Sequence, residues 1–316
     1  MKPCAICGNI FNNTVHVARE MMYGTRKRFR YGECAQCGTL FLMDVPKDMG
    51  SYYPDSYYSL APKKHDAILS YTAAQTLRLS QHVPLIRKVL GRVVNLNSFL
   101  WLQSFYDMPR NSRVLDVGCG KGMNLLLLKG IGFRNLTGID PYLPDHKPLP
   151  TSIKLFKSDL YGINDMYDVI MFHHSLEHMQ QPRDVFQKLE SLLSPNGMVL
   201  IRIPLAQSFA WREYGTDWVQ LDAPRHVFLF SSEAIKILAD ETNLKIKKVQ
   251  YDSTEFQFWG SEQYRKDIPL YFPMSIRTNS KMSLFSRREI SQFREKANKL
   301  NTENDGDQAS FILHKT

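Results

Sequence analysis

The chain has 316 residues, a formal net charge of +9 at pH 7, and an ordinary globular balance of 43% hydrophobic and 22% charged residues. Its apolar runs are shorter than the roughly 20 residues that a membrane-spanning helix needs, and residues 1–7 lack the apolar stretch of a secretory signal. We therefore expect no transmembrane segment and a cytoplasmic location, with the cations spread over a solvated surface rather than gathered for nucleic acid or lipid.

Four of the five cysteines form two Cys-x-x-Cys pairs, and a glycine follows each pair. The pairs are Cys4 with Cys7 and Cys34 with Cys37. Two such pairs supply four thiolates for one tetrahedral zinc ion, and a four-cysteine site is closed and structural. We predict a zinc-binding module over residues 1–45. The alternatives are a site without bound metal and a redox pair, whereas a disulfide framework is not expected without an export signal.

Residues 46–110 are predicted to form a tyrosine-rich segment followed by a helical connector. Tyrosine and serine dominate residues 52–59, and these side chains can pack on the module, cover a ligand site or present hydroxyls to a sugar. From residue 66 to about residue 106 the pattern is helical, with cations between the apolar positions. We favour a connector docked on the main domain over a helix lying on a membrane surface.

Residues 114–122 read Val-Leu-Asp-Val-Gly-Cys-Gly-Lys-Gly. This pattern predicts a buried parallel strand that turns through glycines into a helix starting near Met123. Glycines at such a turn allow tight backbone angles and let a nucleotide approach the backbone closely. The spacing is G-x-G-x-G, which differs from the dinucleotide fingerprint because Met123 stands where a third glycine would be required.

Further strands are predicted at residues 136–140, 152–156, 167–172 and 198–203, with helical patterns between them. This alternation is typical of a parallel sheet with helices on both faces. Two of the strands are followed by acids. Asp140 lies 24 residues after Asp116 and can accept hydrogen bonds from ribose hydroxyls, and Asp159 can accept one from an adenine amino group.

In these segments the chain resembles the class I S-adenosylmethionine-dependent methyltransferases. The resemblance implies an α/β fold, a seven-stranded, doubly wound, Rossmann-like sheet over residues 111–316 with an insertion at about 254–306. It also implies S-adenosylmethionine as cofactor. A generic doubly wound domain for another nucleotide is the alternative. The positions that the resemblance assigns to the cofactor are Asp116, Gly118 and Gly120 on the methionine side, Asp140 at the ribose, Asp159 and Leu160 at adenine, and His173 beside them.

Candidate catalytic residues follow the fourth strand, because ligands of open parallel sheets bind beyond the carboxyl ends of the strands. They are His174, Glu177 and His178, with His226 as a further candidate base. A histidine can take the acceptor's proton near neutral pH. In the opposing interpretation, Glu177 and His178 only open a helix, where they favour its dipole or pack.

The aromatic and polar stretch at 211–226 is predicted to bind substrate, through Tyr214, Trp218, Asp222 and Arg225. It resembles the Trp…Leu-Asp-Pro-Pro-Arg-His segment of bacterial methyltransferases linked to surface polysaccharide and sugar modification, with Ala223 in place of the first proline. The zinc module with a tyrosine run likewise resembles methyltransferases of nucleotide-linked deoxysugars.

The chain ends with strands predicted at 244–253 and 306–315, the last one antiparallel, and a helix near 286–300. We expect methyl transfer to the oxygen or carbon of a small molecule, a saccharide or nucleotide-linked sugar. A zinc-module ribosomal RNA methyltransferase is the alternative, although the fourth strand lacks the Asn/Asp-Pro-Pro-aromatic loop used for base amines. A second alternative is a non-catalytic module that keeps the cofactor pocket only as a scaffold. The sequence leaves the oligomeric state open.

Overall fold

The structure is a computed structural model that describes residues 3–54, 72, 74–80, 83, 85–86, 95–143, 153–279 and 284–316. The predicted tyrosine-rich run beyond residue 54, much of the helical connector and the start of the third strand lie outside the described residues. Within the described part of the chain, no helix is long and apolar enough to cross a membrane.

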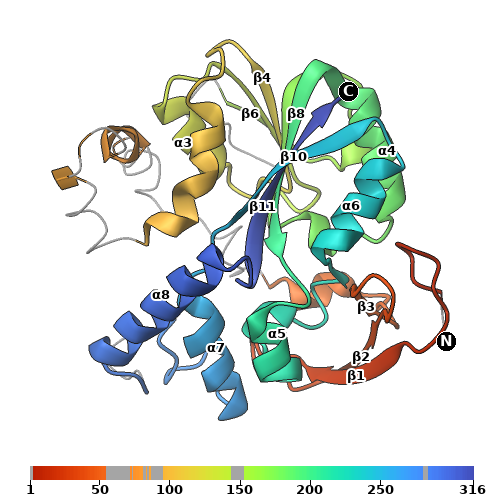
Figure 1. The fold of residues 1–316 in the computed structure, drawn as a ribbon, viewed down its shortest axis with the longest axis vertical. Coiled ribbons are helices and arrows are strands. Elements are labelled where there is room, and N and C mark those ends of the chain that lie inside the picture. Colours follow the sequence, from red (N-terminus) through yellow and green to blue (C-terminus); the bar gives the residue numbers. More distant parts are fainter. Residues whose placement is uncertain are drawn as a thin grey trace.

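Seven strands form the larger sheet, in the order β10-β11-β8-β7-β4-β5-β6 (Figure 1). The parallel strands are β4 (Arg113–Val117), β5 (Asn135–Ile139), β6 (Lys154–Phe156), β7 (Tyr167–His173) and β8 (Leu193–Pro204). The remaining two are β11 (Gln308–Lys315), antiparallel to β8, and β10 (Leu244–Tyr251), antiparallel to β11. The prediction of a doubly wound sheet with an antiparallel final strand is confirmed.

Three of the described helices, α5, α6 and α8, begin after a serine whose side chain caps the first turn. In α4, Val185, Phe186 and Leu189 recur at helical spacing and are buried, and Pro182 occupies the first turn. Ser286 and Glu289 form a capping box at the start of α8. The helices are α3 (Met123–Gly130), α4 (Pro182–Leu192), α5 (Phe209–Tyr214), α6 (Ser232–Asp240), α7 (Phe256–Arg265) and α8 (Arg287–Thr302).

Short 3₁₀ helices lie in places where the sequence pattern suggested the start of an α-helix or a loop. Glu177 and His178 do not open an α-helix, because Met179 is extended and α4 starts only at Pro182. The loop expected at 211–226 contains α5 and two 3₁₀ turns. The 3₁₀ helices are η1 (Met49–Tyr52), η2 (Leu96–Phe105), η3 (Leu160–Gly162), η4 (Leu176–His178), η5 (Gly215–Asp217) and η6 (Val219–Leu221).

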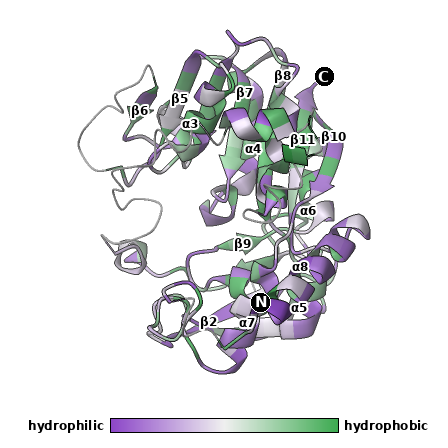
Figure 2. Ribbon diagram, turned by 90° about the vertical axis from the view of Figure 1, so that its left-hand side faces the viewer, coloured by the Kyte–Doolittle hydropathy of each residue, from purple (hydrophilic) through white to green (hydrophobic). Residues whose placement is uncertain are grey.

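A smaller antiparallel sheet contains the N-terminal strands in the order β1-β2-β3-β9. Its first three strands are β1 (Thr14–Arg19), β2 (Arg28–Glu33) and β3 (Leu40–Leu42), and the fourth, β9 (Phe228–Leu229), comes from the segment just before α6. In Figure 2, β9 lies between the larger sheet and the N-terminal strands. The N-terminal sheet is therefore completed by a strand that lies about 190 residues downstream of β3.

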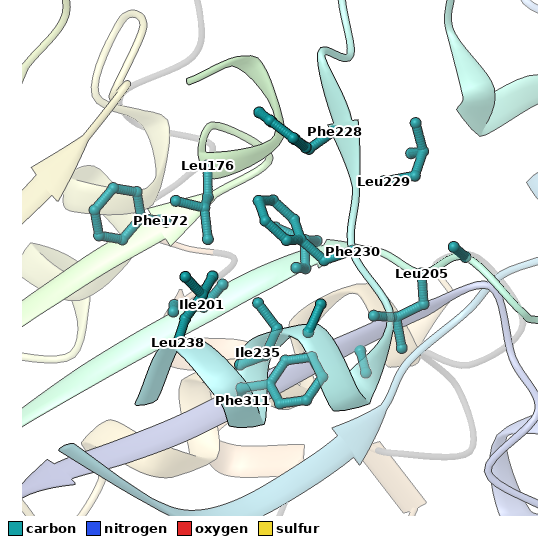
Figure 3. Packing of buried hydrophobic residues seen from close by; sticks show 14 of the residues in the cluster. Phe172, Leu176, Ile201, Leu205, Phe228, Leu229, Phe230, Ile235, Leu238 and Phe311 are labelled. Atoms are coloured by element: carbon teal, nitrogen blue, oxygen red, sulfur yellow. The ribbon is translucent and has the colours of Figure 1, made fainter. Parts of the chain in front are cut away.

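The two sheets share one hydrophobic core. Its buried residues run from Ile6 and Tyr31 in the N-terminal segment to Leu115 in β4 and Phe311 in β11. Figure 3 shows Phe230 beside β9, among side chains from β7, β8, α6 and β11. Because one continuous core spans both sheets, we expect them to unfold together.

Replacing Phe230 with alanine tests this shared core. Phe230 is fully buried, so the cavity left by Phe230→Ala should lower the free energy of unfolding by about 3–5 kcal/mol in a urea titration. Phe272→Ala is the matched control, because Phe272 is 46% exposed and its loss should change stability by less than about 0.5 kcal/mol. Two separate unfolding transitions in the unaltered protein would contradict a shared core.

Candidate active site

The glycine turn after β4 forms the floor of the site. Gly118, Gly120 and Gly122 all have positive φ, at 73°, 49° and 77°. At Gly118 a Cβ atom would lie 2.4 Å from the Cβ of Ser175, so this position has no room for a side chain. Ser175 Oγ donates a 2.6 Å hydrogen bond to the Val117 carbonyl, which fixes the loop after β7 against the turn.

Asp140, at the end of β5, is held rigidly by two backbone amides. Its Oδ2 accepts from Gly120 N at 3.0 Å and its Oδ1 from Tyr142 N at 2.8 Å. Asp116 lies deeper, in β4, and neither of its oxygens has a hydrogen-bond partner among the described residues. Burial, and then the charge of Asp140, raise the pKa of Asp116 well above its usual range. Asp140 is therefore fixed to the glycine turn through Gly120, whereas Asp116 is fully buried within β4.

A cavity of about 920 Å³ opens above the ends of these strands. Of the predicted cofactor residues, Gly118, Gly120, Asp140, Asp159, Leu160 and His173 line it, and Asp116 is not among the described residues of its wall. Its volume lies within the range of sites that enclose a drug-sized molecule. In strand order β6-β5-β4-β7, Asp159 and Asp140 lie on one side of the glycine turn and the histidines on the other.

The histidines after β7 differ in what their ring nitrogens contact. His174 has both engaged, because Arg202 donates to its Nε2 at 3.0 Å and its Nδ1 lies 3.4 Å from Glu177 Oε1. His178 Nδ1 is 2.8 Å from the carbonyl of Arg225. Since a carbonyl only accepts, Nδ1 of His178 carries the proton and Nε2 keeps its lone pair.

His226 lies beside His178, with the ring centroids 4.9 Å apart. Its Nδ1 is 2.8 Å from the carbonyl of Gln220, so the same argument leaves its Nε2 with a lone pair. Nε2 lies 3.9 Å from Glu177 Oε1. Burial, and then the nearby His178, lower the pKa of His226 to about 4, so its imidazole is neutral at pH 7.

Glu177 is fully buried between these rings, and neither carboxylate oxygen has a hydrogen-bond partner among the described residues. Burial alone would raise its pKa, but the interaction with His174 and the charges of His226, His174 and His178 together lower it. The site thus contains an ionised buried carboxylate facing two oriented imidazoles.

Arg225 anchors this cluster through a buried ion network. Its guanidinium donates to both oxygens of Asp222 and, through Nη2, to Glu20 Oε1 at 2.9 Å. Asp222 and Glu20 raise the pKa of Arg225 against the effect of burial, so the charge is retained. Arg225 reaches the cavity wall, whereas Asp222 pairs with it from behind.

The structure separates the other two predicted substrate residues from the cavity. Trp218 is fully buried and donates from Nε1 to Asp307 at 2.9 Å. Tyr214 is 8% exposed and lies under the guanidinium of Arg265, 4.3 Å from the ring centroid. Neither belongs to the described residues of the cavity wall. Their aromatic surfaces pack the helical turns after α5, which the sequence could not distinguish from a sugar-stacking platform.

Two cavity residues were not singled out from the sequence. Tyr53 follows η1, and its hydroxyl oxygen lies 3.2 Å from His178 Nδ1. Arg202 in β8 pairs with buried Asp252 at 2.6 Å while reaching His174. The sequence did contain a signal for Arg202, because it stands between the apolar residues Ile201 and Ile203 of a buried strand. A buried charge requires a partner, so an arginine at such a place indicates an ion pair or a site. Tyr53 belongs to the predicted tyrosine run, but only the fold showed that its hydroxyl lies next to His178.

The four cysteines converge at the N-terminal end of the chain. Cys4 Sγ lies 3.6 Å from Cys37 Sγ, and Cys7 Sγ lies 3.4 Å from Cys34 Sγ. Sulfurs about 2.3 Å from one zinc ion in tetrahedral geometry are about 3.8 Å apart, whereas a disulfide would require about 2 Å. The residues therefore fit a single tetrahedral metal ion.

Residues 91–249, about half of the chain, match a protein family described as a methyltransferase domain. The chain belongs to this methyltransferase family. It is 27% identical over 189 residues to the ubiquinone biosynthesis O-methyltransferase of Rickettsia canadensis (strain McKiel), covering 54% of this chain and 79% of the relative. A tRNA U34 carboxymethyltransferase of Trichlorobacter lovleyi is 28% identical over 104 residues, covering 28% of this chain and 31% of the relative.

A crystal structure of a SAM-dependent methyltransferase from Archaeoglobus fulgidus is also similar, with 22% identity, a TM-score of 0.43, and coverage of 70% of this chain and 94% of that chain. The predicted S-adenosylmethionine-dependent methyltransferase class is thus confirmed. The acceptor, the cytoplasmic location and the roles of individual site residues stay predictions.

Proposed function

We propose that this methyltransferase methylates a hydroxyl oxygen of a small polyhydroxylated acceptor, of the saccharide class. The observation that carries the proposal is the cluster of Glu177, His178 and His226, in which His178 lines the cavity and the buried Glu177 and His226 lie behind it. Hydroxyl methylation requires loss of a proton, and this cluster places basic groups beside the cavity. The similarity to an O-methyltransferase supports an oxygen acceptor.

The residues on the other side of the turn fit the cofactor. Asp140 and Asp159 present carboxylates to the cavity, and partly buried His173 lines it with a buried Nε2 that has no hydrogen-bond partner among the described residues. We assign Gly118, Gly120, Asp140, Asp159, Leu160 and His173 to S-adenosylmethionine. S-adenosylmethionine held there would supply a methyl group on a cationic sulfur. Transfer would form the bond from the acceptor oxygen to the methyl carbon, leave the C–S electron pair on sulfur, and pass the hydroxyl proton to His178, the basic side chain of the cluster that lines the cavity.

The remaining groups orient the acceptor. His178, Tyr53 and Arg225 form one contact chain on the cavity wall, through the Arg225 carbonyl and the Tyr53 hydroxyl. The guanidinium of Arg225 is fully buried and held by two carboxylates, so it fixes the backbone of Arg225, whose carbonyl orients His178. His174 lies between Arg202 and Glu177 and contacts both, so we assign it the role of positioning the Glu177 carboxylate.

Asp140→Ala tests the cofactor assignment. Loss of the carboxylate removes the acceptor group that faces the ligand, and the Kd for S-adenosylhomocysteine in titration calorimetry should rise by roughly 10- to 100-fold, the equivalent of one or two charge-assisted hydrogen bonds. Thermal unfolding should stay cooperative. Unchanged affinity in a folded variant would move the ribose site elsewhere.

The acceptor is identified with isotopically labelled cofactor, a panel of free and nucleotide-linked sugars, and RNA transcripts, read by mass spectrometry. We expect label in a sugar, and turnover roughly 10²–10⁴-fold lower in His178→Ala with the affinity for S-adenosylhomocysteine unchanged. His314→Ala is the control, because His314 lies on β11 and is not in the described cavity wall. Label only in RNA would overturn the proposal.

We also propose that the four cysteines bind structural zinc. The site lies in the core shared by both sheets, so the ion should stabilise the fold rather than take part in catalysis.

Cys34→Ser, or removal of zinc by a chelator, should lower the free energy of unfolding by more than about 3 kcal/mol, because metal loss is among the few single changes with large effects. The affinity of the surviving folded fraction for S-adenosylhomocysteine should change less than threefold. Zinc content by mass spectrometry provides the direct check. A protein that lacks zinc yet is equally stable would rule out this role.

A further inference from the structure

We infer that Glu177, His178 and His226 form a second metal site, which binds a divalent transition-metal ion beside the cavity. The inference deepens the proposed function and rests on it in one respect: the ion would hold two neighbouring oxygens of the acceptor. The cluster is distinct from the four cysteines in both position and ligand chemistry.

The spacing of the three side chains suits a common ion. One nitrogen of each imidazole and one carboxylate oxygen all lie within 4.8 Å of one another, and Glu177 Oε1 is 3.9 Å from His226 Nε2. Ligand atoms about 2.1 Å from a metal ion are about 3–4 Å apart. Small side-chain rotations therefore bring all three into coordination distance.

Both imidazoles are oriented as metal ligands usually are. A ligating histidine almost always donates its other N–H to a carbonyl or carboxylate, which fixes the ring and its tautomer. His178 Nδ1 donates to the Arg225 carbonyl and His226 Nδ1 to the Gln220 carbonyl, both at 2.8 Å. Each ring thus keeps one unshared lone pair at Nε2.

Glu177 supplies the independent observation. Its side chain is fully buried and its two oxygens lack hydrogen-bond partners among the described residues. His174 Nδ1, at 3.4 Å from Oε1, is a long contact for a group of this charge. A buried carboxylate without partners is costly unless a cation compensates it, and a metal ion at this point would do so.

The surrounding charges also favour a cation. The contacts that extend from the cluster join four buried carboxylates to two guanidiniums. The carboxylates are Glu177, Asp222, Glu20 and Asp252, and the guanidiniums are Arg225 and Arg202. The network thus holds twice as many buried carboxylates as guanidiniums, an imbalance that favours a cation at this place.

The ligand set indicates which ion and which acceptor are involved. Two imidazoles and one carboxylate suit Zn²⁺, Fe²⁺, Co²⁺ or Mn²⁺ and leave coordination positions open. His178 lines the cavity, so those positions face the acceptor space. An acceptor with two adjacent oxygens, such as a vicinal diol, could chelate the ion. With the ion bound, the two imidazoles would act as its ligands instead of as bases, and coordination would lower the pKa of the hydroxyl so that its proton passes to water.

Cobalt titration of the zinc-loaded, full-length protein tests this inference. We expect one Co²⁺ per chain, with visible d–d absorption and without the thiolate charge-transfer bands that exchange into the cysteine site would produce. Glu177→Gln and His226→Gln should each weaken Co²⁺ binding by more than about 100-fold, since a direct ligand matters more than an outer-shell partner. His16→Gln is the matched control, because His16 also pairs with a glutamate, Glu33, at 2.8 Å, but outside the cluster.

Calorimetry with S-adenosylhomocysteine on the same samples separates the possible failures. A variant that binds this ligand normally is folded, so lost Co²⁺ binding in it supports the site. If the unaltered protein binds the ligand but takes up no Co²⁺, or takes it up only with thiolate bands, the second metal site is overturned while the proposed function stands. If it binds no S-adenosylhomocysteine, the proposed function itself fails.

Discussion

The buried guanidinium of Arg225 is the contact on which the arrangement of the site depends. It is 1% exposed and bonds to Asp222 in its own loop and to Glu20 just after β1. Taking three charges out of water is costly, and only their close mutual pairing offsets that cost. The network therefore forms only when the N-terminal sheet is docked, which couples the position of that sheet to the geometry of the site.

The Arg225 network also positions the two histidines, through backbone carbonyl groups. The carbonyl of Arg225 holds His178, and the next residue along the chain is His226. Tyr31 of β2 donates to the carbonyl of His226 at 2.8 Å, and Tyr53 approaches His178 from the N-terminal segment. The N-terminal segment thus contacts the His178 side of the cavity, although its cysteines lie in another part of the shared core.

The cavity has two chemically different sides because of where the sheet reverses its strand order. From β4 the chain continues outward to β5 and β6, then returns to β7 on the other side. A ligand crevice forms at such a switch point. Acids with backbone partners lie on the β5–β6 side, and imidazoles with a buried carboxylate lie on the β7 side. This separation matches a reaction in which a cationic donor meets an acceptor that must lose a proton.

The sequence by itself determined where the strands of the larger sheet lie along the chain, because hydrophobic runs, glycine turns and acids after strands are local patterns that a strand and its following turn express within a few residues. The doubly wound sheet was implied by the family resemblance, and the order of the strands in space comes from the structure. It also predicted the pairing of Cys4 and Cys7 with Cys34 and Cys37, since knuckle spacing is local as well. Only the tertiary structure decided that β9 completes the N-terminal sheet, that Trp218 is buried away from the cavity, and that Arg225 joins Glu20. Those outcomes depend on contacts between segments far apart in the sequence, 89 residues for Trp218 with Asp307 and 205 for Arg225 with Glu20. At such positions the same aromatic or charged residue can be either core or site, and only burial and the available partners decide between them.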